Sequence, residues 1–488
     1  MRVKLALMAA GGCMLAAMPA HAQAGNCNQL AGKPLGEHGR IESASNVAGA
    51  PSGGLGFCEV KATLSPVAGS RIGVVYRLPA GWNGKILGLG GGGWAGNVRV
   101  EAAQPGLARG YAVAQTDGGH SGTDVWDNDW VANPEAAKDF SYRAIHEMTV
   151  AAKQMVQLYY GKPQQRTYYQ GCSTGGRMGL MEAQRFPADY DGIIAGAPVY
   201  TLQVQTSALL RNQTFNAPGA GFSPADLALV NAAVLKACGN GKDAYLADAR
   251  ACRWDPATIA CKPGQAAGQC LRPQQAEALR VAYAGIRAPD GSWASLPLEK
   301  GGENGWSRFI ATASGGVDTT RGGGMLGLKP LLFGDTPVDL TKLRADRDVA
   351  TARASAFAKM YEASDPDLTA FVSRGGRLIL WHGMSDPGPS PEGTIDYYDA
   401  VVRQHPQAAS GVRLFLAPGV EHCGGGPGPD RPDTLAALEQ WIEQGRAPAT
   451  VIASNAAGTT NRPLCPFPAQ PRYAGTGDVN DPKSYRCQ

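Results

Sequence analysis

A serine between glycines is the first feature of this sequence that could do chemistry. Gly171-Cys172-Ser173-Thr174-Gly175 fits the pattern G-x-S-x-G and follows the predicted strand 167–169. In this pattern the serine occupies a tight turn between a strand and a helix, so small neighbours are needed. The first N–H groups of the following helix face the same place, and the backbone N–H of Thr174 is a candidate oxyanion donor. We predict that Ser173 is a nucleophile.

A serine hydroxyl needs a base, and two later strand ends supply the candidates. In the strand–turn–helix arrangement an acid and then a histidine follow the serine along the chain. Asp386 lies in the loop after the predicted strand 377–381, and His422 lies in a glycine-rich loop after the predicted strand 412–416. We predict that His422 is the base and that Asp386 orients it. The alternative acids are Asp189, Asp191 and Glu421.

Two cysteines flank these candidates. Cys172 directly precedes Ser173, and Cys423 directly follows His422. If the two cysteines form a disulfide, their Cα atoms lie about 5.5–6 Å apart, and the serine turn is fastened to the histidine loop. The alternative is that Cys172 acts as a thiolate nucleophile. That would leave an odd number of cysteines for pairing and would leave the turn position of Ser173 unused.

Short apolar strands alternate with helices along much of the chain, which is typical of a mostly parallel, doubly wound α/β sheet. The alternation stops near residue 201 and resumes near 375. The simplest account is one α/β domain built from residues 25–200 and 371–488, with residues 201–370 inserted between its strands. Further strands are predicted at 57–64, 71–78, 85–89, 111–114 and 193–195, and helices at 141–160, 175–185, 226–237, 397–403 and 433–444.

Residues 1–24 have the features of a secretory signal peptide. Arg2 and Lys4 precede the apolar run 5–17, and two A-x-A cleavage sites follow between residues 20 and 24. The run is shorter than the roughly 20 residues that span a bilayer. No later segment is long and apolar enough either. We therefore predict a secreted protein, periplasmic or extracellular, that does not cross a membrane.

Of the 11 cysteines, Cys13 falls in this leader, and ten remain. An even number in an exported chain argues for disulfides. A zinc site is the competing interpretation, but its candidate ligands contain no C-x-x-C pair and no histidine lies among them. These candidates are Cys238, Cys252, Cys261 and Cys270. The formal net charge is only +4 and the basic residues are not clustered, so we expect no nucleic-acid partner.

These residues resemble the tannase/feruloyl esterase family, which includes the mono(hydroxyethyl) terephthalate hydrolases. The resemblance rests on residues 171–177, 381–387 and 421–423, with support from 90–93 and 116–120. It covers nearly the whole chain after the leader and implies an α/β-hydrolase fold with a large inserted lid domain. By position it implies the disulfide pairs Cys27–Cys58, Cys172–Cys423, Cys238–Cys252, Cys261–Cys270 and Cys465–Cys487.

The resemblance also bears on oxyanion and metal binding. It places a second oxyanion donor at the backbone of Gly92 or Gly93. Many members carry an aspartate-rich calcium loop after the first lid cysteine, but here Asp243 and Asp248 are the only nearby carboxylates. Calcium takes six to eight oxygen ligands, several of them anionic. The balance is therefore against a bound calcium at these two residues.

Together the residues and the resemblance predict an exported serine carboxylic-ester hydrolase that works through an acyl-enzyme and requires no cofactor. The expected substrates are small esters of aromatic acids of the feruloyl, galloyl or terephthaloyl type. Trp306, Arg321 and Phe333 are candidate substrate-binding residues of the lid by residue type alone. Two alternatives stay open, namely an acyltransferase that uses the same triad and a non-catalytic binder of phenolic ligands.

Overall fold

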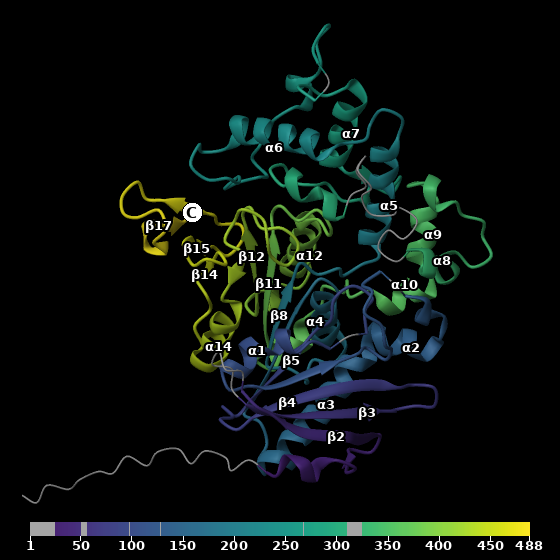
Figure 1. The fold of residues 1–488 in the computed structure, drawn as a ribbon, viewed down its shortest axis with the longest axis vertical. Coiled ribbons are helices and arrows are strands. Elements are labelled where there is room, and N and C mark those ends of the chain that lie inside the picture. The colour runs from purple at the N-terminus through teal and green to yellow at the C-terminus, as the bar shows by residue number, and fades with distance from the viewer. Residues whose placement is uncertain (1–24, 50–55, 97, 127, 267, 310–324) are drawn as a thin grey trace, which may run out of the picture.

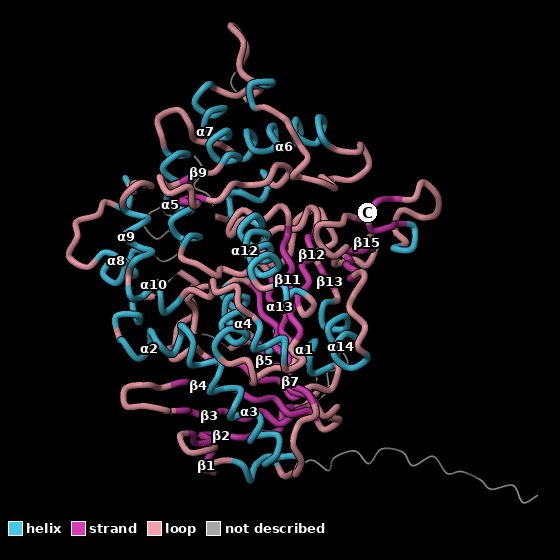
Figure 2. The backbone as a smooth tube through the Cα atoms, turned by 180° about the vertical axis from the view of Figure 1, so that it is seen from behind, coloured by secondary structure: helices cyan, strands magenta, loops and turns pink. Residues whose placement is uncertain are grey.

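A ten-stranded sheet forms the centre of the protein (Figures 1 and 2). The computed structural model describes residues 25–49, 56–96, 98–126, 128–266, 268–309 and 325–488, so the predicted leader lies outside the described residues. In spatial order the strands are β1 (Pro34–Leu35), β2 (Gly39–Val47), β3 (Phe57–Leu64), β4 (Ile72–Pro79), β6 (Ala112–Thr116), β5 (Lys85–Leu89), β7 (Arg166–Cys172), β8 (Gly192–Gly196), β11 (Arg377–Gly383) and β12 (Val412–Ala417).

The sheet has an antiparallel part and a parallel part. β1 to β4 pair antiparallel, and β4 also pairs antiparallel with β6. From β6 to β12 every neighbouring pair is parallel. The carboxyl ends of these six strands therefore lie at one edge of the sheet, where ligands bind in open α/β folds. Ser173, Asp386 and His422 follow β7, β11 and β12 at this edge.

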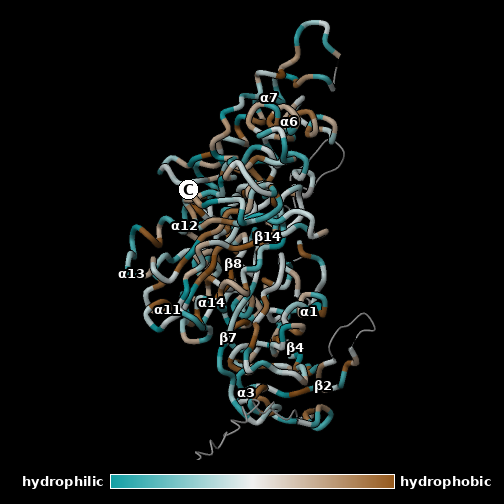
Figure 3. Tube along the Cα trace, turned by 90° about the vertical axis from the view of Figure 1, so that its left-hand side faces the viewer, coloured by the Kyte–Doolittle hydropathy of each residue, from teal (hydrophilic) through white to brown (hydrophobic). Residues whose placement is uncertain are grey.

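Alternate residues of the parallel strands enter two different hydrophobic cores. Ile86 and Leu378 belong to one core, while the adjacent Leu87 and Ile379 belong to the other. This is the pattern of a sheet covered by helices on both faces. Figure 3 shows hydrophobic segments concentrated in the middle of the molecule, near β8.

Helices from both ends of the chain cover the sheet. The first core contains residues of α3 (Ala144–Tyr160), α4 (Thr174–Arg185), α11 (Thr369–Ser373), α12 (Pro391–Gln404) and α13 (Pro406–Ala409). The second core contains residues of α1 (Val100–Ala108) and α14 (Thr434–Gln444). Before α3 the chain forms the short helical segments η1 (Cys27–Leu30), η2 (Asp129–Ala132), α2 (Pro134–Lys138) and the π-helical turn η3 (Asp139–Arg143).

Residues 201–370 contribute no described strand to the large sheet, and their elements divide between two cores. α6 (Pro224–Cys238) and α7 (Pro273–Ala284) share a separate core with η5 (Glu303–Arg308), and they lie at the end of the molecule remote from β2 (Figure 1). α5 (Gln203–Asn216) enters this core through Phe215 and the first core through Leu209 and Leu210. α8 (Met325–Phe333), α9 (Asp348–Ala354) and α10 (Ala356–Tyr361) join the first core instead. The remaining elements are η4 (Pro256–Ile259), β9 (Ile286–Arg287), β10 (Trp293–Ser295) and η7 (Leu340–Lys342).

Small β elements and five disulfides complete the fold. The C-terminal elements are β13 (Arg431–Pro432), β14 (Val451–Ser454), β15 (Asn461–Leu464), β16 (Pro471–Tyr473), η8 (Pro482–Ser484) and β17 (Tyr485–Cys487). The disulfides are Cys27–Cys58, Cys172–Cys423, Cys238–Cys252, Cys261–Cys270 and Cys465–Cys487, the same pairs that the resemblance implies. The zinc interpretation is therefore wrong, because its four cysteines are bonded to one another.

None of the helices in the described ranges has the length and apolar character needed to cross a membrane.

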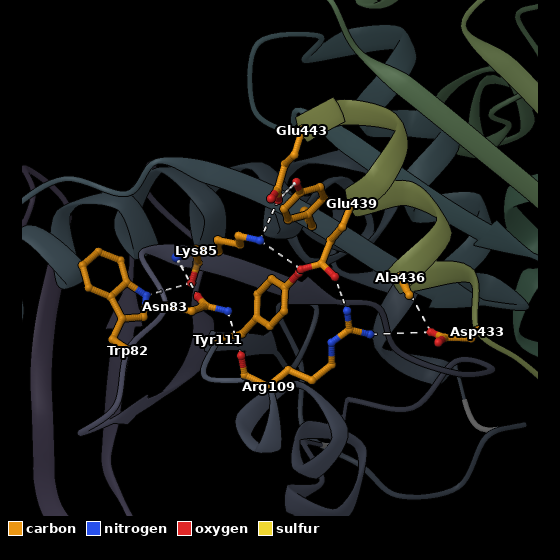
Figure 4. A network of polar contacts seen from close by, with 10 residues as sticks. Trp82, Asn83, Lys85, Arg109, Tyr111, Asp433, Ala436, Glu439 and Glu443 are labelled. Atoms are coloured by element: carbon orange, nitrogen blue, oxygen red, sulfur yellow. Dashed lines mark hydrogen bonds and ion pairs between the residues drawn. The ribbon is translucent and has the colours of Figure 1, made fainter. Parts of the chain in front are cut away.

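A polar network joins α14 to the amino-terminal end of β5 (Figure 4). The Lys85 ammonium lies 3.1 Å from a Glu439 carboxylate oxygen and 2.6 Å from a Glu443 carboxylate oxygen. Arg109, just after α1, forms an ion pair with Glu439, and the Tyr111 hydroxyl donates to the same carboxylate. All these side chains are at least half buried, so the network fastens the second layer of helices to the edge of the sheet opposite the candidate site.

Candidate active site

Ser173 occupies the turn that its glycine-flanked motif predicts. β7 ends at Cys172 and α4 begins at Thr174, and the residue between them has φ 61° and ψ −125°. A positive φ is rare for a residue with a side chain, and such strain is found at functional sites. A Cβ on Gly171 would come within 2.4 Å of the Gly175 carbonyl oxygen, so no larger residue fits there.

His422 and Asp386 are in direct contact. The Nδ1 atom of His422 lies 2.7 Å from Oδ2 of Asp386, and the Asp386 carboxylate is fully buried. Its second oxygen, Oδ1, accepts a hydrogen bond of 2.8 Å from the backbone N–H of Gly388. With Nδ1 held in this way, Nε2 of His422 is the ring nitrogen available for proton transfer, which is the arrangement of a base and its orienting acid.

A second imidazole, that of His382 in the motif 381–387, also holds Asp386. Nε2 of His382 lies 3.2 Å from Oδ2 of Asp386, and its Nδ1 lies 2.7 Å from the Thr394 hydroxyl. Burial by itself would raise the pKa of Asp386, but the charge of His422 and hydrogen bonds from both histidines hold that pKa at about 2. The carboxylate is therefore ionised over the whole pH range in which an ester hydrolase works.

The alternative acids lie elsewhere. Asp189 contacts His146 at 2.6 Å, and Asp191 accepts a hydrogen bond of 2.8 Å from the backbone N–H of Thr167. Glu421 is adjacent to His422 in sequence, but its side chain lines a different cavity. Among the three alternatives and Asp386, only Asp386 has a carboxylate in hydrogen-bonding contact with the His422 ring in the described structure.

Ser173 and His422 line the same cavity, which has a volume of about 480 Å³. The Cys172–Cys423 disulfide forms part of its wall and joins the segments that carry them, with 5.9 Å between the Cα atoms and 251 positions between the two cysteines. The thiolate alternative is wrong, because the sulfur of Cys172 is bonded. The disulfide therefore holds the serine turn beside the histidine loop.

The predicted oxyanion loop lies on the same wall. Gly92, Gly93 and Thr174 all line the cavity. Gly93 has φ 57°, and a Cβ there would come within 2.5 Å of the Val125 carbonyl oxygen. The loop is fixed beyond Gly93, because the backbone N–H of Trp94 donates to the Val125 carbonyl oxygen at 2.9 Å.

Two aromatic rings that sequence reasoning missed form a wall of the cavity. Trp126 and Phe309 both line it. The Phe309 ring contacts the His422 ring edge-on at 5.1 Å between centroids, and the Trp126 ring contacts Phe309 edge-on at 6.2 Å. No local pattern marks these two among the aromatic residues of the chain. The signal is only their proximity to His422 in the folded protein.

The substrate-binding residues expected from residue type need correction. Trp306 is 1% exposed and packs between the rings of Phe215 and Tyr283 in the core of the inserted segment. Phe333 is buried in the first core with α8. Neither lines the cavity, because burial in a core uses their apolar surface for packing. Arg321 lies outside the described residues.

The two candidate calcium ligands do not fit a calcium ion. A carboxylate oxygen of Asp243 lies 3.4 Å from the Arg462 guanidinium, and its other oxygen accepts a hydrogen bond from Asn240. Asp248 accepts from the backbone N–H of Ala251. In the described ranges, these carboxylates belong to no group of three side chains that could hold a metal ion. We assign no calcium-dependent step to them.

Comparison with known proteins gives consistent results. The sequence matches the family described as "Tannase and feruloyl esterase" over residues 58–303 and 327–488. It is 33% identical to a mono(2-hydroxyethyl) terephthalate hydrolase of Piscinibacter sakaiensis, covering 88% of this chain and 84% of that protein. It is 31% identical to a probable feruloyl esterase of Arthroderma benhamiae, covering 90% and 86%.

Solved structures show the same fold. Feruloyl esterase B from Aspergillus oryzae is similar with a TM-score of 0.83 at 24% identity, covering 93% of this chain and 97% of that one. Tannin acyl hydrolase from Aspergillus niger is similar with a TM-score of 0.75 at 23% identity, covering 94% and 93%. The predicted α/β-hydrolase fold is confirmed. Together with the sequence matches, this establishes that the chain belongs to the tannase and feruloyl esterase family.

Proposed function

We propose that the protein hydrolyses esters of aromatic acids through an acyl-enzyme formed on Ser173. Family membership makes it a carboxylic ester hydrolase. The observation that carries the mechanism is that Ser173, on a strained turn, lines one cavity with His422, whose ring is bonded to the buried Asp386. A nucleophile, a base and an orienting acid are the groups that acyl transfer requires.

In the acylation step the Ser173 oxygen attacks the ester carbonyl carbon, and Nε2 of His422 takes the hydroxyl proton. The carbonyl oxygen becomes an oxyanion, and the backbone N–H groups of Thr174 and of Gly92 or Gly93 bind it. Removing one such donor typically lowers the rate by about 10²–10³. The intermediate collapses when the bond to the alcohol oxygen breaks, and His422 returns the proton to the leaving alcohol. Asp386 stabilises the imidazolium that forms between these two events.

Deacylation repeats these steps with water. His422 removes a proton from a water molecule, whose oxygen attacks the acyl carbon, and the carboxylic acid leaves as the proton returns to the oxygen of Ser173. The reaction uses only groups of this chain and water, so we predict that no cofactor is needed.

The substrate class rests on the cavity wall and on the relatives. Trp126 and Phe309 give the wall flat apolar surfaces beside His422, which suit an aromatic ring. The names of the relatives refer to feruloyl, terephthalate and tannin esters. Esters of aromatic carboxylic acids are therefore the proposed substrates.

Export is part of the proposal. Five disulfides support folding in an oxidising compartment, because disulfides are rare in the reducing cytosol. The leader predicted for residues 1–24 agrees with this. Fractionation of a host that expresses this sequence distinguishes a periplasmic protein from an extracellular one.

The test compares the disulfide-intact protein with its Ser173→Ala variant on p-nitrophenyl acetate, methyl ferulate, methyl gallate and mono(2-hydroxyethyl) terephthalate. We expect hydrolysis of at least one aromatic ester, and a loss of about 10⁶ in kcat on removing the nucleophile. Circular dichroism and thermal melting of both proteins serve as the control for folding. A phosphonate ester that labels active serines should add its mass to the peptide containing Ser173 in the wild type alone.

Three outcomes would change the assignment. Equal rates for the wild type and Ser173→Ala would contradict the serine mechanism. Binding of phenolic esters without turnover would favour the non-catalytic binder. Transfer of the acyl group to an added alcohol in preference to water would favour the acyltransferase.

A further inference from the structure

His382 contacts the acid of the candidate site from outside the cavity. Its ring belongs to β11 and is completely buried. The described residues that line the cavity include Ser173 and His422 but not His382. A substrate in the cavity therefore does not touch this imidazole, and any effect of His382 on the reaction passes through Asp386.

The two nitrogens of the His382 ring have different surroundings. Nε2 lies 3.2 Å from Oδ2 of Asp386 and 3.1 Å from the Pro389 carbonyl oxygen, and an ionised carboxylate and a carbonyl can only accept hydrogen bonds. Nε2 must therefore carry a hydrogen. Nδ1 lies 2.7 Å from the Thr394 hydroxyl, which can donate to it. The tautomer with hydrogen on Nε2 satisfies all three contacts, and the Thr394 hydroxyl favours that tautomer.

Both imidazoles contact the same oxygen of Asp386. Nδ1 of His422 lies 2.7 Å from Oδ2, and the backbone N–H of Gly388 donates to the other oxygen, Oδ1. His422 and Gly388 come from loops, whereas His382 comes from a central strand of the sheet. Strands hold functional groups more precisely than loops do. His382 is therefore the donor that ties the position of the carboxylate to the sheet.

Thr394 extends these contacts to α12. The series runs from Thr394 through His382 and Asp386 to His422, and its first three members are at most 2% exposed. Hydrogen bonds in such a buried series are stronger than in water, and a group left without its partner there is costly. The series thus joins the base at the cavity to a strand and a helix of the α/β domain.

We propose that His382 is a positioning residue that holds Asp386 toward His422, and that Thr394 fixes the tautomer of His382 that makes this possible. The proposal rests on the proposed function. During acylation and deacylation Asp386 stabilises the imidazolium of His422, and for this Oδ2 has to face Nδ1 of that ring. Since His382 does not touch the substrate, its loss should lower kcat and kcat/KM together and not weaken substrate binding.

Two substitutions separate the hydrogen bond of His382 from the mere presence of a polar side chain. The amide nitrogen of glutamine is as many bonds from Cα as Nε2 of histidine, so His382→Gln keeps a donor near Asp386. The amide nitrogen of asparagine is one bond nearer to Cα, at the place of Nδ1, so His382→Asn loses that donor. With p-nitrophenyl acetate we expect kcat and kcat/KM to fall by about 10² in His382→Asn, because the carboxylate is misplaced. His382→Gln should recover most of this loss.

A second pair of variants tests the hydroxyl that holds the ring. Thr394→Val keeps the shape of the side chain and removes the hydroxyl, and we expect kcat to fall about five-fold. Thr394→Ser keeps the hydroxyl and should stay close to the wild type. The matched control is His38→Asn, because His38 is exposed between β1 and β2 and should not affect the rate. The rate of Ser173→Ala is subtracted as background, and circular dichroism and thermal melting establish that each variant is folded at the assay temperature.

The outcomes separate this inference from the proposed function. A folded wild type that hydrolyses p-nitrophenyl acetate no faster than Ser173→Ala contradicts the proposed function, and this inference with it. If the wild type is active, a wild-type kcat in His382→Asn would overturn the inference alone. So would equal losses in His382→Asn and His382→Gln, because the donor to Asp386 would then not be the group that matters. Should His382→Asn fail to fold, equal kcat values in Thr394→Val and Thr394→Ser would overturn the proposal.

Discussion

Charged side chains are arranged in opposite ways at the two edges of the parallel sheet. At the amino-terminal end of β5, Lys85 and Arg109 meet Glu439, and Lys85 also meets Glu443 (Figure 4). At the other edge Arg99 and Arg211 line the candidate active-site cavity, whose described wall contains no acid. Both regions are at least partly buried, so the difference does not come from solvent alone.

The comparison shows which charges serve the fold and which remain available to a ligand. A buried ion pair with both members present is compensated, whereas a buried charge without a partner destabilises the protein. The paired charges at the amino-terminal end of β5 therefore fix α14 and α1 against the sheet. At the opposite edge Arg211 is buried with two of its nitrogens lacking a partner among the described residues, while Arg99 is exposed to solvent. The predictions below test this contrast, from the largest expected effect to the smallest.

The largest effect is expected for Asp386, which holds His422 at the edge of the sheet that carries the cavity. Asp386→Asn should lower kcat by about 10⁴, because an asparagine no longer stabilises the imidazolium and favours the wrong tautomer of His422. Steady-state kinetics on the best aromatic ester measures the loss. Asp399→Asn is the control, since Asp399 pairs with Arg403 on the surface of α12. Wild-type kcat in the Asp386 variant would show that His422 does not depend on this carboxylate.

Removing Glu439, the acid shared by Lys85 and Arg109 at the amino-terminal edge of the sheet, should lower stability and leave activity unchanged. Glu439→Gln keeps the size of the side chain and an acceptor for the Tyr111 hydroxyl, but it leaves Lys85 and Arg109 short of a counter-charge. We expect the free energy of unfolding to fall by about 2 kcal/mol, measured by urea denaturation, while kcat/KM on the best ester keeps its wild-type value. Glu277→Gln, in the exposed pair with Arg280, should leave stability unchanged. A Glu439→Gln variant that is stable but inactive would contradict the assignment of Glu439 to the fold and not to catalysis.

A buried acid without an ion pair should make stability depend on pH. Asp117, which follows β6, forms no ion pair with the described residues, and burial raises its pKa to about 6 although N–H groups of Gly119 and Gly73 oppose the shift. Because the folded protein holds this proton more tightly than the unfolded chain, the stabilisation is complete below about pH 4 and is lost as the pH rises to about 6. We expect a loss of about 2 kcal/mol over this range.

Asp117→Asn isolates that contribution. Both N–H groups donate to the same oxygen, Oδ1, which asparagine retains. The difference in unfolding free energy between wild type and variant should therefore change between pH 4 and pH 6 and stay constant above that range. Urea denaturation in a pH series measures it. A difference that does not vary with pH would mean that Asp117 is ionised at pH 4 in the folded protein.

The smallest effect is expected in the uncharged part of the cavity wall. Phe309→Leu removes the ring that lies edge-on to His422, and we expect KM for methyl ferulate to rise about five-fold. The KM for ethyl butyrate, which has no ring, should change less, and Tyr473→Leu on the surface is the matched control. Equal effects on both esters would mean that Phe309 acts on His422 and not on the substrate ring.

Local patterns predicted much of the fold. The strand expected at 377–381 is observed as β11, Arg377–Gly383, and the helix expected at 226–237 is observed as α6, Pro224–Cys238. α1 was missed because Pro105 and Gly106, both unfavourable in a helix, lie inside it. β2 was missed because most of its residues are exposed and its sequence does not alternate clearly between apolar and polar residues.

The candidate site was predictable where a residue follows a strand end. Ser173, Asp386 and His422 each lie in the turn or loop that follows a recognisable apolar strand, and the order of parallel strands then brings them to one edge. His382, Trp126, Phe309 and Arg211 carry no such mark. Phe309 and Arg211 belong to the inserted segment and reach the cavity only through its packing, whereas Trp126 comes from the loop after β6 and His382 contacts Asp386 from within β11. Residue type pointed instead to Trp306 and Phe333, which pack in cores.

By itself the sequence determined the glycine-flanked turn, the strands and helices around it, and the even set of cysteines, because these depend on steric limits and periodicity over a few residues. Only the tertiary structure decided which acid meets His422, which rings face the cavity, and which arginines lack an acid. Those contacts join residues far apart along the chain, and they depend on three packed cores and on a disulfide spanning 251 positions that hold the segments together. Local conformational preference carries no information about such distances, because packing alone selects the partners.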